Sequence, residues 1–338
     1  MNAPQDHSGQ NQGGQDHGGQ DHGGNIDAAI ARFGPGDWID LSTGINRRAF
    51  PLPALTQAAW RGLPTDSAQA RLVAAASAAW GANPGLAGVA LGGAQAAIQL
   101  VPRLAPAGAA RVLVPTYNEH AACLRAAGWD VQGCGMLDDL AGSDLAVVVN
   151  PNNPDGRCWG VDALIALAGR VGLLVVDESF ADAQPALSLL PQACPANLLI
   201  LRSFGKFYGL AGLRLGYVLG APPLIDALAR MAGPWPVAGP AIEIGAAALA
   251  DTAWAEAMRA QLAADALRAD GLAQAAGWAC VGGTPLFRLY DTPDAGAARD
   301  RLASARIWSR IFPYSPRWLR LGLPGAEDEW HRLAAALA

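Results

Sequence analysis

The residue type best suited to covalent chemistry occurs only once in this sequence, at Lys206. All the other basic residues among its 24 lysines and arginines are arginines, although lysine is normally among the commonest amino acids. A guanidinium keeps its proton and forms no Schiff base, whereas a desolvated lysine amine loses its proton and condenses with a carbonyl. Glycines, the hydroxyl of Ser203 and the guanidinium of Arg214 stand near this lysine in the sequence. These neighbours favour a reactive amine over the alternative, an ordinary surface lysine.

Groups that bind phosphates accompany Lys206. The segment Gly92-Gly93-Ala94-Gln95 stands between an expected strand and an expected helix, where free backbone N–H groups bind anions. Ser203 adds a hydroxyl and Arg214 adds a fixed positive charge, and both are natural phosphate ligands. A tight strand-to-helix turn is the alternative explanation for the paired glycines. Together these groups predict a phosphate-bearing cofactor whose aldehyde meets Lys206.

Three further side chains could bind an aromatic cofactor ring. Asp177 follows four apolar residues and could keep a ring nitrogen protonated, or it could cap a helix. Asn153 could donate to a phenolic oxygen, or it could form a turn before Pro154. Tyr117 could stack on the ring face, or it could be a half-buried core residue. Pyridoxal 5'-phosphate is the cofactor that uses a phosphate site, both ring partners, a ring face and one lysine, so the set predicts that cofactor.

Short apolar segments alternate with helical segments over most of the chain. The expected helices in this part include residues 54–61, 66–80, 94–104 and 161–170. The expected strands are residues 89–91, 111–114, 145–149, 173–176, 198–201 and 215–219. Such strands predict an α/β fold with a mostly parallel sheet sandwiched by helices. Ligands bind at the carboxyl ends of strands in these sheets, and the candidate residues stand at those ends.

The pattern changes after the Pro/Gly-rich segment 231–236, which we interpret as a hinge. The elements expected beyond it are a helix over 240–276 with a break near Asp251, strands at 286–290 and 317–323, and a helix over 326–337. They predict a smaller α+β domain. We therefore expect a large cofactor-binding domain over residues 51–234, and a small domain made of residues 22–50 and 235–338.

The remaining features of the sequence restrict the class of protein. Residues 1–21 repeat Gln-Asp-His-Gly-Gly-like units, which predict a disordered tail with solvated histidines rather than a metal site. The net charge of −5 with no basic run argues against a nucleic-acid partner. Pro84 and several glycines interrupt the longest uncharged stretch, so no membrane span is expected, and the start does not resemble a signal peptide. Five scattered cysteines suit a reducing cytoplasm.

The order of the motifs resembles that of the fold-type I pyridoxal-phosphate enzymes. The motifs are Gly-Gly-Ala-Gln, Pro-Thr-Tyr, Asn-Pro-Asn-Asn-Pro-x-Gly, Asp-Glu-Ser-Phe, Ser-Phe-Gly-Lys and Arg-Leu-Gly, and the resemblance covers roughly residues 22–335. It implies a seven-stranded type of sheet, with Lys206 as the catalytic Schiff-base lysine and Asp177 as the partner of the pyridine nitrogen. The cofactor-binding residues that it implies are Gly93, Ala94, Tyr117, Asn153, Asp177, Ser203, Lys206 and Arg214.

Among these enzymes the chain most resembles the threonine-phosphate decarboxylases of cobalamin biosynthesis. Phe180 stands where aminotransferases usually carry a tyrosine, and His22-Gly23-Gly24-Asn25 with residues 40–46 resembles the start of that subgroup. The resemblance implies a carboxy-lyase acting on a phosphorylated amino acid, O-phospho-L-threonine, as a cytoplasmic homodimer. The substrate-binding residues that it implies are Arg320, Arg310, Asn46 and His22, with no metal.

Two other functions remain open from the sequence. The first is an aminotransferase acting on histidinol phosphate or a similar amino acid, which uses the same cofactor and fold. The second is a regulatory or scaffold protein with a decayed site, against which the intact set of site residues argues. Leu63-Pro64 stands where relatives often have Tyr-Pro reaching a neighbouring subunit's phosphate site. Whether a second subunit contributes to the cofactor phosphate site is therefore also open.

Overall fold

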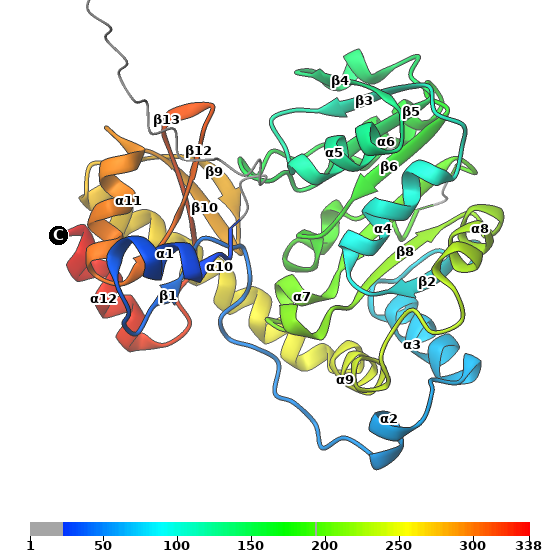
Figure 1. Cartoon of the computed structure of the whole chain (residues 1–338), viewed down its shortest axis with the longest axis horizontal. Helices are drawn as coiled ribbons and strands as arrows, with labels where there is room; N and C mark the ends of the chain where they lie inside the picture. The colour runs from blue at the N-terminus through cyan, green and yellow to red at the C-terminus, as the bar shows by residue number, and fades with distance from the viewer. Residues whose placement is uncertain (1–22, 193–194) are drawn as a thin grey trace, which may run out of the picture.

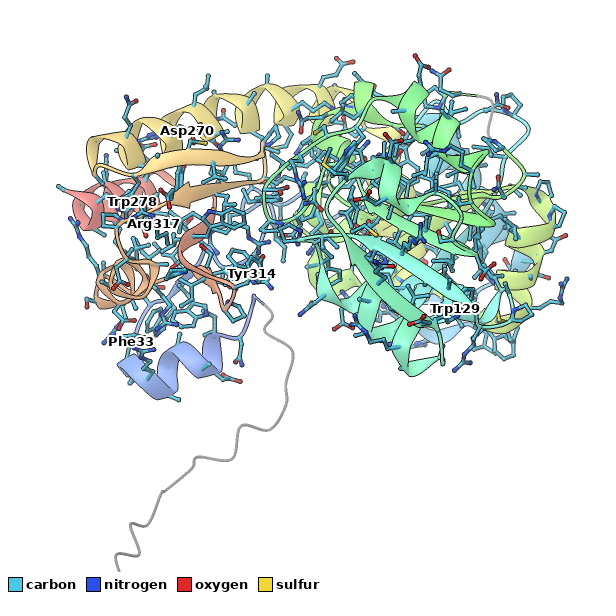
Figure 2. The ribbon with its side chains drawn as sticks, turned by 90° about the horizontal axis from the view of Figure 1, so that it is seen from above. Phe33, Trp129, Asp270, Trp278, Tyr314 and Arg317 are labelled. Carbon is cyan, nitrogen blue, oxygen red and sulfur yellow. The ribbon has the colours of Figure 1, made fainter. Side chains whose placement is uncertain are left out.

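The computed structural model describes residues 23–192 and 195–338 and builds them around one large sheet and one smaller sheet. The large sheet, with its covering helices, lies beside the small one, and α10 (Thr252–Ala275) runs along both (Figure 1). Viewed from above, the labelled residues on the small-sheet side, opposite Trp129, are Phe33, Asp270, Trp278, Tyr314 and Arg317 (Figure 2). The predicted tail, residues 1–21, lies outside the described residues.

The large sheet has seven strands in the order β2-β8-β7-β6-β5-β3-β4. Their bounds are Ala87–Leu91 (β2), Gly216–Gly220 (β8), Leu198–Ser203 (β7), Leu173–Asp177 (β6), Leu145–Val149 (β5), Ala109–Leu113 (β3) and Asp130–Cys134 (β4). Strand β8 runs opposite to the other six, so its pairings with β2 and β7 are antiparallel and all the others are parallel. This arrangement confirms the predicted α/β class with its mostly parallel, seven-stranded sheet. The edge strand β4 was not predicted, because it is mostly exposed and lacks the apolar run of the buried strands.

Alternate residues of the central strands join two different apolar clusters. Val148 and Val176 belong to the cluster on one face, whereas Val147 and Val175 belong to the cluster on the other. Successive side chains of a strand point to opposite faces, so both faces are buried and the strands are apolar throughout. Helices supply the covering layers (Figure 1). The helices of this part are Asp66–Ala79 (α3), Ala94–Leu100 (α4), Asn118–Ala126 (α5), Val161–Ala168 (α6), Phe204–Phe207 (α7), Pro222–Ala232 (α8) and Gly239–Ala250 (α9). Helix α2 (Gln57–Arg61) packs on α9 instead.

The second sheet is antiparallel, with the order β12-β13-β10-β9. Its strands are Ala279–Thr284 (β9), Phe287–Asp291 (β10), Arg310–Phe312 (β12) and Ser315–Gly322 (β13), and its helices include α10, Ala295–Ser304 (α11) and Glu327–Leu337 (α12). Asp251 separates α9 from α10 and caps the latter, because its side chain accepts from Trp254 N at 2.9 Å. The predicted break in the long helix is thus confirmed. No helix within the described ranges is both long and apolar enough to cross a bilayer.

The N-terminal part of the described chain is joined to the C-terminal part. Helix α1 (Ile26–Phe33) leads into β1 (Ile39–Asp40), which pairs in parallel with β11 (Ile307–Trp308). This pairing agrees with a small domain that draws on both ends of the chain, although the predicted boundaries themselves stay a prediction. From β1 the chain crosses to the turn that carries the single lysine, where Asn46 N donates to Lys206 O at 2.9 Å.

Candidate active site

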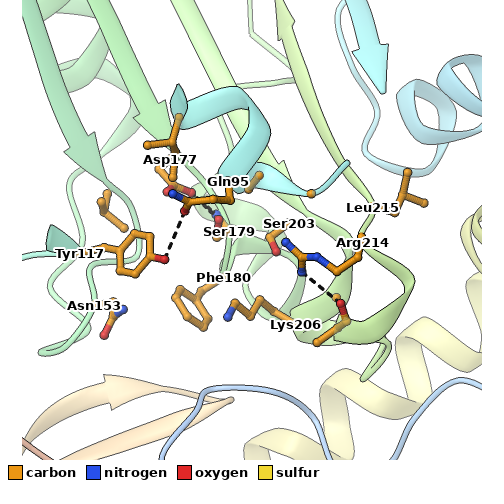
Figure 3. A pocket seen from close by; sticks show the side chains of 16 residues that line it. Gln95, Tyr117, Asn153, Asp177, Ser179, Phe180, Ser203, Lys206, Arg214 and Leu215 are labelled. Carbon is orange, nitrogen blue, oxygen red and sulfur yellow. Dashed lines mark hydrogen bonds between the residues drawn. The ribbon is translucent and has the colours of Figure 1, made fainter. Parts of the chain in front are cut away.

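A cavity of about 150 Å³ lies at the carboxyl ends of the large-sheet strands. All eight residues predicted to bind the cofactor line it, together with Gln95, Ser179 and Phe180. Asp177 ends β6, Ser203 ends β7, and Gly93 follows β2. The side chains from these elements converge around one space (Figure 3). The fold therefore brings together residues that are spread over more than 120 positions of the chain.

Lys206 lies in the short helix α7, directly after β7. Burial lowers the pKa of its amine to about 8, and the nearby guanidinium of Arg320 adds to this shift. The ring of Phe180 forms part of the apolar surroundings, with its centroid 5.8 Å from Lys206 Nζ. A lysine with a lowered pKa keeps a useful fraction of neutral amine near pH 7, as attack on a carbonyl requires.

A phosphate-sized cradle forms between Gly93, Ala94, Ser203 and Arg214. Gly93 has a φ of +88°, and a Cβ there would lie 2.8 Å from Arg214 Nη2, so a side chain would displace the guanidinium. Arg214 itself has a left-handed backbone with φ 54°, and its Nη1 donates to Ala211 O at 3.1 Å. No side chain caps the first turn of α4. Free backbone N–H groups, a hydroxyl and a held guanidinium are the donor set that a phosphate needs.

The carboxylate of Asp177 lies buried on the side of the cavity away from the solvent. Burial opposes its charge, but hydrogen bonds from His120 and Ser179 outweigh this and hold the pKa of Asp177 below its usual range. His120 Nε2 lies 2.9 Å from Asp177 Oδ2, and Ser179 N donates to Asp177 Oδ1 at 2.9 Å. The hydrogen bond from Ser179 N closes a local turn, as expected if Asp177 were a capping residue. The buried carboxylate nevertheless stays charged and lines the cavity.

Tyr117 and Asn153 form another part of the wall. Tyr117 precedes α5, and burial together with Glu119 raises the pKa of its hydroxyl to about 12. Asn153 Oδ1 accepts a hydrogen bond from Arg320. An amide oxygen held in this way leaves the amide nitrogen of Asn153 as the donor for another acceptor.

A second cavity of about 90 Å³ shares Tyr117, Asn153, Phe180 and Lys206 with the first. Arg310 and Arg320 also line it. These arginines are direct partners across the antiparallel strands β12 and β13, so their side chains project from the same face of the sheet. Arg320 is buried, and its Nη2 donates to Ser42 O at 2.6 Å. Guanidinium groups bind carboxylates and phosphates, so this face of the sheet has the chemistry to bind an anionic ligand.

Phe180 lines both cavities and packs against the second sheet. Its ring packs edge-to-face on Phe287, with the centroids 4.9 Å apart. A Cβ at Gly44 would lie 2.8 Å from each of these rings, so the glycine allows the chain to pass close to them. An apolar ring without a hydroxyl therefore stands beside Lys206, as the sequence indicated.

The other two predicted substrate ligands have different outcomes. Asn46 is buried, and its Nδ2 donates to Phe207 O at 2.9 Å. It is absent from the lining of both cavities, so its observed contacts position the turn around Lys206. Its predicted contact with the substrate stays a prediction. His22 lies outside the described residues.

The sequence interpretation missed His120, Ser179 and Gln95. His120 follows Tyr117 by three residues, which places it in the first turn of α5 beside the cavity. The sequence signal that could have identified His120 is its position three residues after Tyr117, a candidate to stack on the cofactor ring. Its pairing with Asp177, 57 positions away, depends on how α5 packs and could not be read from spacing.

Comparison with known proteins identifies the family. Residues 67–337 match the family described as aminotransferase class I and II. The chain belongs to this family. It is 44% identical over 324 residues to a threonine-phosphate decarboxylase of a Sinorhizobium species, covering 93% of this chain and 96% of that protein. A threonine-phosphate decarboxylase of Pseudomonas aeruginosa is 43% identical over 311 residues, covering 89% of this chain and 91% of that protein.

Among solved structures, a histidinol-phosphate aminotransferase of Sinorhizobium meliloti in complex with pyridoxal-5'-phosphate is similar in fold. Its TM-score is 0.76 at 25% identity, and the match covers 92% of both chains. Membership of the class I and II aminotransferases implies pyridoxal 5'-phosphate as the cofactor of this chain. The cradle at Gly93 and Arg214, the buried anion of Asp177 and the lysine of lowered pKa fit that molecule.

Proposed function

We propose that this protein decarboxylates O-phospho-L-threonine, using pyridoxal 5'-phosphate, to (R)-1-amino-2-propanol O-phosphate and carbon dioxide. The observation that carries this proposal is the 44% identity to a threonine-phosphate decarboxylase, extending over 96% of that protein. A histidinol-phosphate aminotransferase of Mycobacterium bovis is 34% identical over 265 residues, covering 73% of this chain and 71% of that protein. Because the match to the decarboxylase is both closer and longer, the reaction of the decarboxylases is the first choice. The proposal places the reaction in cobalamin biosynthesis, as the sequence resemblance implied.

The paired arginines suit a substrate that carries two anionic groups. Arg310 and Arg320 project from one face of the small sheet toward the cavity that contains Lys206. Guanidinium groups bind phosphates and carboxylates through two parallel hydrogen bonds. In our proposal Arg320, the more buried of the two, binds the substrate phosphate. Arg310, at the junction with the outer cavity lined by Phe312 and Tyr314, completes the anion site.

The bond to be broken joins the Cα atom to the carboxylate carbon. When bound, pyridoxal phosphate supplies an electron-accepting ring for the electron pair that this bond leaves behind. Asp177, with its pKa held low by His120 and Ser179, stays anionic and would favour the protonated form of the cofactor's pyridine nitrogen. Carbon dioxide leaves, and Lys206 Nζ then delivers a proton to Cα. The anionic carboxylate departs as neutral carbon dioxide and leaves its electron pair behind at Cα. The proton from Lys206 forms the new C–H bond with that pair, so each turnover takes up one proton, which Lys206 regains from solvent.

Phe180 adds an argument for decarboxylation. Its ring presents no hydroxyl to the cavity, and it lies beside Lys206. In our proposal the ring desolvates the leaving carboxylate without holding it by a hydrogen bond. A strongly held carboxylate would be stabilised in the ground state and would leave more slowly.

The decisive experiment incubates the purified protein with O-phospho-L-threonine and measures carbon dioxide and the phosphorylated amine. Release of both, in equal amounts and without a 2-oxo acid, is the expected result. Conversion of a 2-oxo acid to an amino acid, with no carbon dioxide, would instead favour the aminotransferase. Absence of both activities, with a visible cofactor band that borohydride removes, would mean an idle site and would refute both enzyme proposals.

A cytoplasmic homodimer completes the proposal. Large apolar side chains are exposed on neighbouring elements, with Trp60 65% exposed on α2 and Trp235 55% exposed before α9. Gly239, at the start of α9, approaches Ala59 so closely that a Cβ would lie 2.2 Å from Ala59 O. Exposed apolar area gathered on contiguous elements supports a protein partner. Light scattering of the purified protein is the test, and a monomeric mass at micromolar concentration would contradict the dimer.

A further inference from the structure

A chain of polar contacts runs along one wall of the larger cavity to the hydroxyl of Tyr117. Gln95, in the first turn of α4, lines this cavity. Its Nε2 donates to Glu119 Oε2 at 2.6 Å, and its Oε1 accepts from the Tyr117 hydroxyl at 3.3 Å. The side chain of Gln95 reaches toward Tyr117 in the close view (Figure 3). None of the roles proposed above uses Gln95 or Glu119.

The carboxylate of Glu119 decides which end of the Gln95 amide faces Tyr117. A carboxylate accepts hydrogen bonds but donates none, so it selects the NH₂ group of the amide. The amide oxygen is then turned toward Tyr117, whose hydroxyl must act as the donor. Hydrogen bonds to an anion are roughly twice as strong as neutral ones, so Glu119 gives the amide a preferred orientation that a neutral neighbour would not give.

The state of Tyr117 fits this role as donor. Burial and the neighbouring charges of Glu119 and Asp177 raise the pKa of its hydroxyl to about 12, so the proton stays on the oxygen. On its other side, the Tyr117 ring meets His120 edge-on, with the centroids 6.2 Å apart and an interplanar angle of 85°. His120 in turn lies 2.9 Å from Asp177. These contacts connect Asp177 with Glu119 through His120, Tyr117 and Gln95.

We propose that Gln95, oriented by Glu119, is a positioning residue that fixes the ring of Tyr117 over the cofactor ring. This inference rests on the cofactor placement proposed above, but not on which reaction follows. In this arrangement the Tyr117 hydroxyl donates to Gln95. That arrangement agrees with the ring-oxygen role proposed for Asn153, whose amide nitrogen remains available as a donor.

The test is a double-mutant cycle that measures the cofactor rather than turnover. Gln95→Leu, Tyr117→Phe and the combined variant are stripped of cofactor, and pyridoxal phosphate is then titrated back. We expect each single variant to bind about three- to tenfold more weakly, with a weaker circular dichroism of the bound cofactor. The combined variant should bind no more weakly than Tyr117→Phe alone. Losses that multiply, or wild-type affinity and dichroism in Gln95→Leu, would overturn the proposal.

Glu119→Gln provides a second cycle that preserves the shape of the side chain. It should reduce the dichroism in the wild-type background and have no effect in the Tyr117→Phe background, and an equal effect in both would refute the role of Glu119. This cycle replaces the first if Gln95→Leu fails to fold. Gln99→Leu, at an exposed position later in α4, is the matched control and should bind the cofactor as wild type does. Since all readouts concern the cofactor, a missing decarboxylase activity would refute the proposed function without affecting this test.

Discussion

Removing the guanidinium of Arg320 tests which end of the substrate this arginine holds. Decarboxylation converts an anionic carboxylate into a neutral molecule, so a strong ion pair to that carboxylate would stabilise the substrate more than the transition state. A decarboxylase gains by holding the phosphate firmly and the carboxylate loosely. The phosphorylated amine product has a phosphate and no carboxylate. The affinity of the enzyme for this product therefore depends on how firmly the phosphate is bound, with no contribution from a carboxylate.

The magnitude follows from the burial of the contact. Arg320 is 3% exposed, so its hydrogen bonds to a bound phosphate would be shielded from water. Loss of a charged, two-pronged contact should cost about 2–3 kcal/mol, which is roughly a hundredfold in affinity. Arg310→Ala should cost less, about tenfold, because the side chain of Arg310 is only half-buried and solvent screens its charge.

The assay measures the inhibition constant of (R)-1-amino-2-propanol O-phosphate for Arg320→Ala and Arg310→Ala. Arg317→Ala is the control, because Arg317 lies on the same strand but forms an exposed ion pair with Asp291, and its inhibition constant should stay within about twofold. Because Arg320 also donates to Asn153, its removal could disturb the cofactor site. The cofactor affinity of each variant is therefore measured as well. If both Arg310→Ala and Arg320→Ala bind the product like wild type, the phosphate is held elsewhere and the reasoning fails.

The other predictions concern the groups around the cofactor. Lys206→Ala should lose covalent attachment of the cofactor and nearly all turnover, since the chain contains no second lysine; an absorbance band that borohydride still reduces would contradict this. Asp177→Asn should keep the fold, judged by thermal unfolding, but lose turnover sharply, because an amide does not favour a ring proton as an anion does; wild-type rates would make Asp177 a structural cap. His120→Phe should raise the pKa of Asp177, seen as a pH-dependent change of the cofactor spectrum absent from wild type. In cofactor-free protein the pKa of Lys206 is about 8 instead of 10.5, so the neutral amine is the minor form below pH 8. The rate of cofactor capture should then rise about tenfold per pH unit up to pH 8 and level off above it; a rise continuing to pH 10 would show an unshifted amine.

The strand ends explain why so much of the cofactor site could be predicted. Each buried parallel strand is a short apolar run, and the polar residue that stops the run marks the carboxyl edge of the sheet. Asp177 was found in this way, and it lines the cavity. The edge strand β4 escaped the same reasoning, because it is exposed and carries no such run.

Sequence alone was enough to find the single lysine, the glycine-rich turn at residues 92–95 and the apolar strands, because local chemistry and local periodicity encode these features. Only the tertiary structure decided which distant residues meet. The register of β12 against β13 puts Arg310 opposite Arg320, and a shift of one residue would turn one of them to the other face. The packing of α5 brings His120 to Asp177, and that of α4 brings Gln95 between Glu119 and Tyr117. Such contacts depend on how whole elements dock, and docking is the sum of many weak apolar contacts that no short motif records.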